Sequence, residues 1–178
     1  AIAGLRASTN TAAYCKARMR LPQEALDQVL DEVASETHAK ACIPKLMWCG
    51  RRVKVVDGSS VSMPDTPENR ELYPQPSGQK PGCGFPVARL TVMFCLASGV
   101  VLAHAKAALG ISERALFRAL WDRLEQGDVV LADRGFCSYA EMHMLSQLGV
   151  DCVMRKNARR GKTSLIQKRL GKNDLLML

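Results

Sequence analysis

The spacing of hydrophobic positions changes along the chain, and its first part is typical of helices. Residues 9–20 predict a short basic helix, and Pro22 opens a second one. In the second helix, apolar residues recur at i, i+3, i+4 and i+7, which predicts one buried face made of Leu26, Val29, Leu30 and Val33. We therefore interpret residues 1–50 as a helical N-terminal segment.

The pattern then becomes that of β-strands. A β-branched run at 51–58 ends in an acid and a glycine, and a loop rich in Pro and Gly follows at 64–86. Such a loop is expected on the surface and is long enough to be functional. Two apolar runs at 87–97 and 100–107 flank Ser98-Gly99, which predicts an antiparallel hairpin.

Helical and strand patterns alternate after the hairpin. Helices are predicted at 112–124 and 138–148, and buried strands at 128–133 and 150–155. The resulting order β, β, β, α, β, α, β predicts an α/β fold with an incomplete RNase H-like mixed sheet, over residues 51–156. A further strand is expected to begin at Asp174 and to be cut off by the end of the chain.

Basic residues are concentrated at both ends of the chain. The net charge is +4 over residues 1–56, −1 over 57–156 and +5 over 157–178. This distribution favours a polyanion as partner, with carboxylate chemistry in the middle. We interpret residues 157–178 as the start of a basic insertion or linker, and the helices of 1–50 either as a hairpin packed on a larger body or as an arm that also contacts DNA phosphates.

Several function classes have little support. The seven cysteines form no C-x-x-C pair, and the spacing of His38, Cys42 and Cys49 fits no familiar zinc site. The Ser-rich run at 58–62 is not a nucleophile elbow, and no glycine motif resembles a phosphate-binding loop. The longest uncharged stretch, residues 90–105, is too short to cross a bilayer, so a soluble, cytoplasmic protein with no membrane partner is expected.

Asp57 and Asp133 are the candidate catalytic residues. Each follows an apolar predicted strand and precedes a small or flexible turn. If these two strands are neighbours, their carboxylates converge at one edge of the sheet, where ligands gather. Two adjacent carboxylates suit Mg²⁺, which takes oxygen ligands and supports phosphodiester displacement. The alternative is that each aspartate only caps the turn after its strand.

Other charged residues give weaker signals. Glu113 and Glu141 lie on the predicted helices and are expected to be solvated acids. Lys106 and Arg155 lie at predicted strand ends, where they either contact phosphate or serve as edge charges.

Local sequence words around the two aspartates are more specific. They read VVDGSSVSMPDTPENREL at 55–72, GFPVARL at 84–90 and GDVVLADRGFCSY at 127–139, and TNTAAYCKARMRLP precedes them at 9–22. Together they resemble the DDE transposases of bacterial insertion sequences, in the insertion sequence four family whose third acid lies in a Y-R-E signature. The resemblance covers nearly the whole chain.

The resemblance implies an RNase H-like catalytic core in which Asp57 and Asp133 match the first two acids of the triad. It also implies two Mg²⁺ ions, with Mn²⁺ as a possible substitute, that serve DNA nicking and strand transfer. The partners would be double-stranded DNA, as terminal repeats and target, and a second copy of the protein in a homodimeric synaptic complex. The location would be the bacterial cytoplasm, in association with the nucleoid.

The chain departs from the family pattern at its C-terminal end. No Y-x-x-R-x-x-x-E word follows residue 155, and Glu71 precedes the second aspartate, so it does not match the third acid. We expect a truncated transposase with little or no activity alone, with one apolar sheet face exposed and a tendency to associate. The alternatives are a non-catalytic module that only binds DNA or dimerises, and an unrelated RNase H-like nuclease acting on RNA or junctions.

Overall fold

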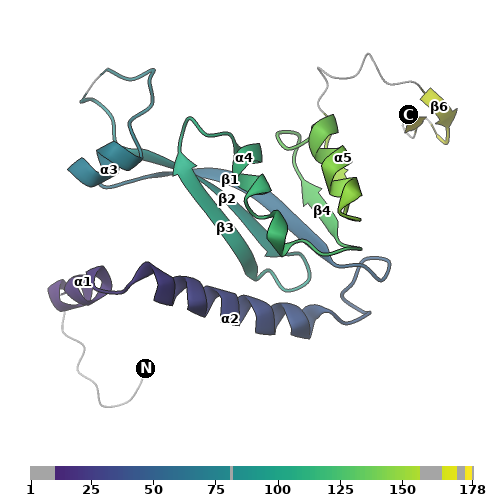
Figure 1. Cartoon of the computed structure of the whole chain (residues 1–178), viewed down its shortest axis with the longest axis horizontal. Helices are drawn as coiled ribbons and strands as arrows, with labels where there is room; N and C mark the ends of the chain where they lie inside the picture. Colours follow the sequence, from purple (N-terminus) through teal and green to yellow (C-terminus); the bar gives the residue numbers. More distant parts are fainter. Residues whose placement is uncertain (1–10, 81, 157–165, 172–174, 178) are drawn as a thin grey trace.

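The computed structural model describes residues 11–80, 82–156, 166–171 and 175–177. It begins with two helices, α1 (Ala12–Met19) and α2 (Gln23–Ala41), which confirms the predicted pair. Figure 1 shows α2 running beside the sheet and α1 lying apart from it, at the far end of α2. The first part of the predicted basic helix, residues 9 and 10, lies outside the described residues.

The predicted buried face of α2 is wrong. Leu26, Val29 and Val33 are 49%, 58% and 51% exposed, and only Leu30 of the four predicted residues is partly buried. The buried residues of the helix are Ala34 and Ala41. Helix α2 packs against β3 (Val101–Ala108). Alanine side chains let a helix approach a strand closely, so the small residues form the contact and the larger ones remain outside it.

The first half of the sheet is an antiparallel meander of β1 (Val53–Ser62), β2 (Val87–Cys95) and β3. The hairpin predicted around Ser98-Gly99 is confirmed, with Gly99 at a φ of 73°. The predicted loop contains a short helix, α3 (Pro67–Leu72), because Thr66 caps it by accepting a hydrogen bond from the N–H of Asn69.

The second half alternates helices with parallel strands. It comprises α4 (Glu113–Arg118), the 3₁₀ turn η1 (Trp121–Arg123), β4 (Val129–Ala132), α5 (Tyr139–Gln147) and β5 (Asp151–Met154). The helix predicted over 112–124 is therefore interrupted after Arg118. The tighter turn that follows places the ring of Trp121 against that of Phe117, with centroids 5.8 Å apart.

The five strands form one mixed sheet in the order β3-β2-β1-β4-β5. Strand β4 runs parallel to both β1 and β5, while β1, β2 and β3 are antiparallel. The predicted RNase H-like arrangement is confirmed. Strands β6 (Ile166–Arg169) and β7 (Leu175–Met177) form a separate antiparallel pair, and Asp174, where a strand was expected to begin, lies outside the described residues.

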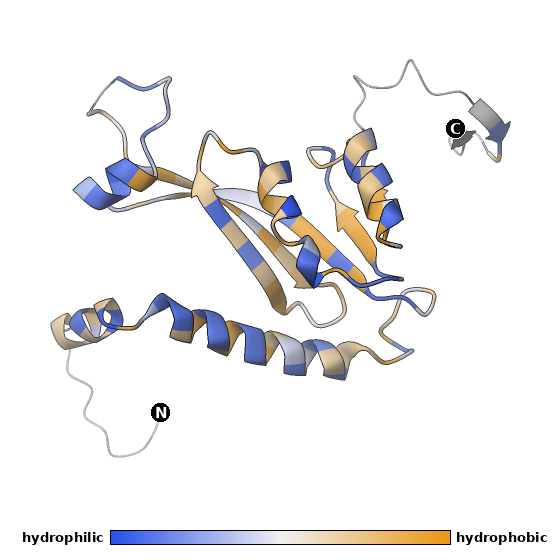
Figure 2. Cartoon of the chain, in the orientation of Figure 1, coloured by the Kyte–Doolittle hydropathy of each residue, from blue (hydrophilic) through white to orange (hydrophobic). Residues whose placement is uncertain are grey.

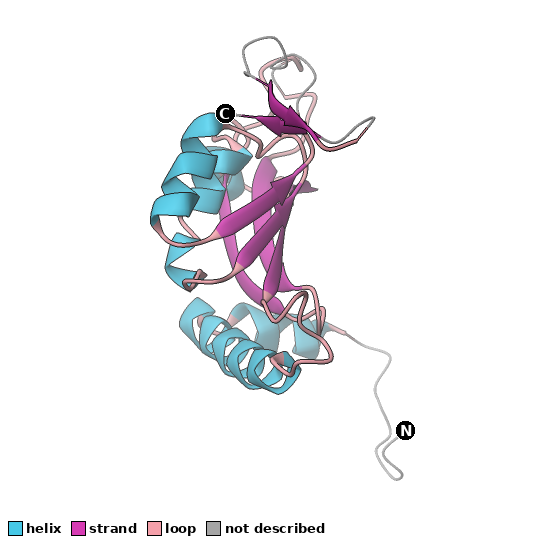
Figure 3. Cartoon of the chain, turned by 90° about the vertical axis from the view of Figure 1, so that its right-hand side faces the viewer, coloured by secondary structure: helices cyan, strands magenta, loops and turns pink. Residues whose placement is uncertain are grey.

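Helices α2, α4 and α5 cover one face of the five-stranded sheet (Figure 3). The core lies between this face and the helices, and its largest fully buried apolar side chains are Phe117, Phe136, Met93, Leu145, Val56 and Val130. Strand β4 is apolar throughout, as expected of a central parallel strand (Figure 2). On the opposite face Val55 pairs with Leu131 and both are partly buried, while Val153, beside Leu131, is 49% exposed.

None of the helices in the described ranges is long and apolar enough to cross a membrane.

Candidate active site at the carboxyl ends of the central strands

The topology brings Asp57 and Asp133 to equivalent positions on neighbouring strands. In the parallel pairing of β1 with β4, Val56 is opposite Ala132, and the two aspartates are the next residues along the chain. Both are exposed. The sequence therefore predicted correctly that these two acids come to one edge of the sheet.

The predicted end of the first strand is wrong, because β1 continues five residues past Asp57 to Ser62. Its pairing with β4 stops at Val56, whereas its pairing with β2 extends to the Ser62–Val87 pair. Asp57 thus lies where β4 ends and the sheet continues as the three-stranded meander of β1, β2 and β3. Because no β4 residue pairs with β1 beyond Val56, the side of Asp57 that faces β4 is open to solvent.

Each aspartate is held by a local backbone hydrogen bond. The Asp57 Oδ1 accepts from the N–H of Gly58 at 2.8 Å, and the Asp133 Oδ1 accepts from the N–H of Gly135 at 2.7 Å. These bonds orient the carboxylates. For Asp133, which precedes a turn, the bond agrees with the alternative interpretation of a turn-capping residue, whereas Asp57 lies within β1 and caps no turn. Since each bond uses one oxygen of a carboxylate that has about four lone-pair sites, acceptor capacity remains for a cation.

Glu113 lies next to this edge, although it was expected to be a solvated helix acid. It comes from the first turn of α4 and is partly buried against β1. A methyl group on Gly58 would lie 2.5 Å from its Cδ, so glycine at this position makes room for the carboxyl group. The sequence signal is the Asp-Gly pair itself, but the pair does not say which side chain occupies the space.

Glu141, also expected to be solvated, is 1% exposed. It forms an ion pair with Arg118, which joins α5 to α4. Burial acts to raise the pKa of Glu141, but hydrogen bonds from Ser138 and Arg118 outweigh it and hold the pKa below its ordinary value. Nothing in the local sequence distinguishes this glutamate from a surface one, because its partner is 23 residues away.

The turn after Asp133 is anchored by an aromatic contact. Phe136, in the D-R-G-F word, is 1% exposed and packs edge-to-face on Phe117 with ring centroids 5.8 Å apart. The turn that carries the second acid is therefore fixed to the core on one side and, through Glu141, to α4 on the other.

A charged cluster at the opposite ends of the same strands was not predicted. Lys54 of β1 and Asp128, just before β4, are 2% and 0% exposed, and their Nζ and Oδ2 atoms lie 2.7 Å apart. Arg52 Nε lies 2.9 Å from Asp128 Oδ1, and Arg51 Nη1 lies 2.6 Å from Asp151 Oδ2 at the start of β5. These contacts fix the register of β1 against β4, which in turn aligns the two aspartates.

Arg155 and Lys106, for which the sequence allowed either a phosphate contact or an edge charge, lie at different distances from the two aspartates. Arg155 follows Met154, which pairs with Ala132, so Arg155 occupies the position on the β5 side that corresponds to Asp133. Lys106 is on β3 opposite Leu90, beyond β2 from the acids. Both are exposed, and only Arg155 is level with the acidic pair.

In the part of the chain that the structure describes, no group of three or more His, Cys, Asp or Glu side chains is arranged to hold a metal ion. The site therefore contributes two carboxylates rather than a complete ligand set.

Comparison with known proteins decides the family. The model of the family described as "Transposase DDE domain" matches residues 48–176, most of the chain. The chain belongs to this family. The expected resemblance to insertion-sequence transposases is thus confirmed.

Individual relatives agree with the family. The chain is 27% identical over 174 residues to "Transposase InsG for insertion sequence element IS4" of Escherichia coli K12, an alignment that covers 98% of this chain and 39% of InsG. It is 27% identical over 138 residues to "Putative transposase InsZ" of the same organism, covering 77% of this chain and 46% of InsZ. The chain thus spans less than half the length of these relatives.

A solved structure, "Mos1 transposase paired-end complex with left transposon end", is also similar. It matches 75% of this chain and 43% of its own, with a TM-score of 0.38 and 15% sequence identity.

Proposed function

We propose that the chain is part of a transposase that cleaves DNA and transfers strands at insertion-sequence ends, with Asp57 and Asp133 as two of its metal-binding catalytic acids. In this proposal residues 51–156 are the catalytic core, between the helical segment 1–50 and the basic segment 157–178. One observation carries the assignment: the parallel pairing of β1 and β4 puts the two acids side by side at an open sheet edge. Membership of the transposase family supports the reaction class.

The chemistry of the site fits Mg²⁺, with Mn²⁺ as a substitute. Mg²⁺ is commonly bound by one or two carboxylates together with substrate phosphates and waters, and two exposed aspartates on adjacent strands supply such a set. When bound, the ion would stabilise the charge that develops on the phosphodiester and favour ionisation of an attacking water. Asp57 and Asp133 would hold it, and Arg155, level with them on the β5 side, would bind an adjacent DNA phosphate.

For the chain taken alone, we propose a narrower role as the alternative function. The described residues bring two acids together and no third metal ligand to them. A two-carboxylate site binds metal weakly, so this chain by itself would bind double-stranded DNA and associate with a second copy without completing strand transfer. Such binding would place it on the bacterial nucleoid.

Metal binding tests the site directly. We would titrate the chain with Mn²⁺ alone and follow the free ion by electron paramagnetic resonance. Asp57→Asn and Asp133→Asn are each expected to weaken binding at least about tenfold, because each removes one of two protein ligands. Glu71→Gln is the matched control, since it removes an exposed carboxylate of α3 and should leave binding unchanged.

Nicking of supercoiled plasmid in Mn²⁺ tests the alternative. If the chain nicks DNA and both aspartate variants do not, it is a nuclease in its own right. If it binds DNA without metal and nicks nothing, the binding role stands for this chain. Unchanged Mn²⁺ affinity in both aspartate variants would refute the site.

A further inference from the structure

The two N-terminal helices expose an unusual amount of apolar surface. Within residues 14–33, six large hydrophobic side chains are each about half exposed or more: Tyr14 (66%), Met19 (85%), Leu21 (52%), Leu26 (49%), Val29 (58%) and Val33 (51%). On α2, the spacing of Leu26, Val29 and Val33 puts them on one side of the helix. We call residues 12–33 with these side chains the arm.

Helix α1 is short and lies at the surface of the molecule. It is eight residues long, and none of its residues is buried. Isolated helices of this length are marginal in water, because one or two turns do not offset the cost of nucleation. A surface that covers α1 would therefore stabilise it, and its own apolar residues, Tyr14 and Met19, would supply the contact.

The charge along the two helices is segregated. Residues 11–22 carry three basic side chains and no acid, which gives a net charge of +3. Helix α2 carries five acids and one lysine, a net charge of −4. A parallel pair of arms would place like charges against each other, whereas an antiparallel pair places the basic α1 of one copy on the acidic α2 of the other.

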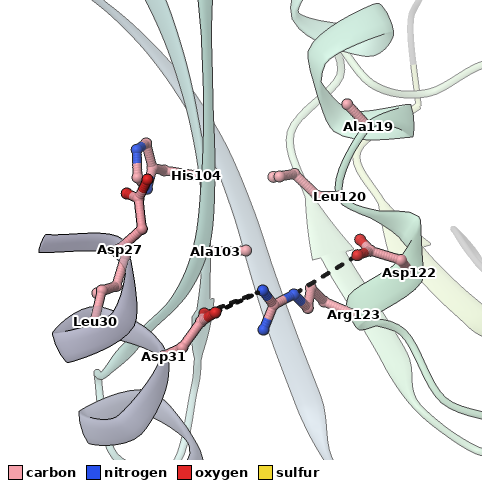
Figure 4. A pocket seen from close by; sticks show the side chains of 9 residues that line it. All are labelled: Asp27, Leu30, Asp31, Ala103, His104, Ala119, Leu120, Asp122 and Arg123. Carbon is pink, nitrogen blue, oxygen red and sulfur yellow. Dashed lines mark hydrogen bonds and ion pairs between the residues drawn. The ribbon is translucent and has the colours of Figure 1, made fainter. Parts of the chain in front are cut away.

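We propose that the arm is a self-association surface on which a second copy of this chain docks antiparallel. A twofold axis near Pro22 would place α1 of each copy on the first turns of α2 of the other. Tyr14 and Met19 would then cover the apolar side formed by Leu26, Val29 and Val33. The basic residues of α1 would face Asp27 and Glu32, which are both exposed and accept hydrogen bonds from Gln23 and Gln28, one turn away in the same helix. Asp27 also lines a pocket between α2 and the sheet, beside His104 (Figure 4).

The proposal deepens the pairing of copies in the proposed function, by naming the surface that would form the dimer. It does not depend on the acids at the sheet edge. Association is measured without DNA or metal, so its failure and the failure of the Mn²⁺ titration are separate results.

The test is sedimentation equilibrium of the full chain over a range of concentrations, with charge-swapped variants. The first variant is Lys16→Glu/Arg18→Glu, which makes α1 acidic, and the second is Asp27→Lys/Glu32→Lys, which makes the start of α2 basic. In a dimer of either variant alone, α1 of one copy and α2 of the other would carry charges of the same sign. Dimerisation of each variant should therefore weaken at least about tenfold. An equimolar mixture should recover the dimer as a heterodimer, because both helix contacts then pair opposite charges.

An apolar variant completes the design. Val29→Glu should give a monomer, whereas Leu72→Glu, which charges an equally exposed apolar residue on α3, should leave the dimer intact. A wild-type chain that stays monomeric, or a mixture of the two charge variants that fails to dimerise, would overturn the proposal. So would a Lys16→Glu/Arg18→Glu chain that dimerises normally but loses affinity for DNA, since that result would make α1 a DNA contact.

Discussion

Replacing Asp128 with asparagine should destabilise the fold far more than removing any of the exposed ion pairs. Asp128 is 0% exposed and lies 2.7 Å from the ammonium of Lys54, which is 2% exposed. The substitution keeps the shape of the side chain but leaves the Lys54 charge buried without its counterion. Breaking a buried ion pair in this way costs about 3–5 kcal/mol, a large part of the 5–15 kcal/mol that typically holds a domain folded.

Urea unfolding followed by circular dichroism measures this cost. The matched control is Glu125→Gln, because Glu125 forms a 2.8 Å pair with Arg52 but is 63% exposed and should contribute less than about 1 kcal/mol. Lys54→Met should cost less than Asp128→Asn, since Asp128 would keep Arg52 and the N–H of Glu125 as partners.

The double variant Lys54→Met/Asp128→Asn should be more stable than the sum of the two single losses predicts, because neither charge is then left alone. If Asp128→Asn costs no more than Glu125→Gln, the cluster is not desolvated, and its role in fixing the β1–β4 register would have to be abandoned.

Three further outcomes are expected, each measured by thermal unfolding. The pKa of Glu141 is lowered in the folded state from 4.5, so its contribution is present above about pH 4.5 and is lost as the pH falls through the folded pKa. Glu141→Gln should lower Tm at pH 7 and remove that acid-side slope, and a slope that persists in the variant would contradict the assignment. The pKa of His38 is lowered from 6.5 by burial and by Lys54, so His38 favours unfolding as the pH falls below about 6.5, and His38→Gln should make stability less pH-dependent there. Gly58→Ala should lower Tm slightly by displacing the flexible Glu113 side chain, and adding Glu113→Ala should restore it, whereas additive losses would place the strain elsewhere.

The order of the sheet could be predicted because the hydrophobic period changes clearly along the chain. The alternation of apolar strands with helices after residue 100 survives in the structure as β3, α4, β4, α5 and β5. The face of α2 could not be predicted in the same way. Two sets of apolar residues lie on that helix, one of large side chains and one of alanines, and the alanines are buried against the sheet. A search for hydrophobic periodicity gives alanine little weight, so it selects the set of large side chains instead.

In the candidate site, too, some residues could be predicted from the sequence and others could not. Asp57 and Asp133 could be found because each follows an apolar run and has a glycine one or two residues later, although only Asp133 proved to precede a turn. Glu141 and Lys54 could not, because a buried charge is recognisable only from its partner, and those partners lie 23 and 74 residues away in sequence. The position of Glu113 could not be predicted for a related reason. The space that its side chain fills exists because Gly58, on another element, has no side chain.

The meander of β1, β2 and β3 is built from neighbours in sequence, whereas the β1–β4 pairing closes a long loop. Asp57 and Asp133 are 76 residues apart. Local hairpins form quickly, and long-range parallel pairing is slow because the chain must lose more entropy before contacts compensate for it. The two carboxylates therefore remain separate in a growing or refolding chain until β4 docks, so affinity for a divalent cation would be acquired in the last stage of folding. If the proposed site binds a divalent cation, that binding would serve as a kinetic signal that the sheet has closed in the correct register.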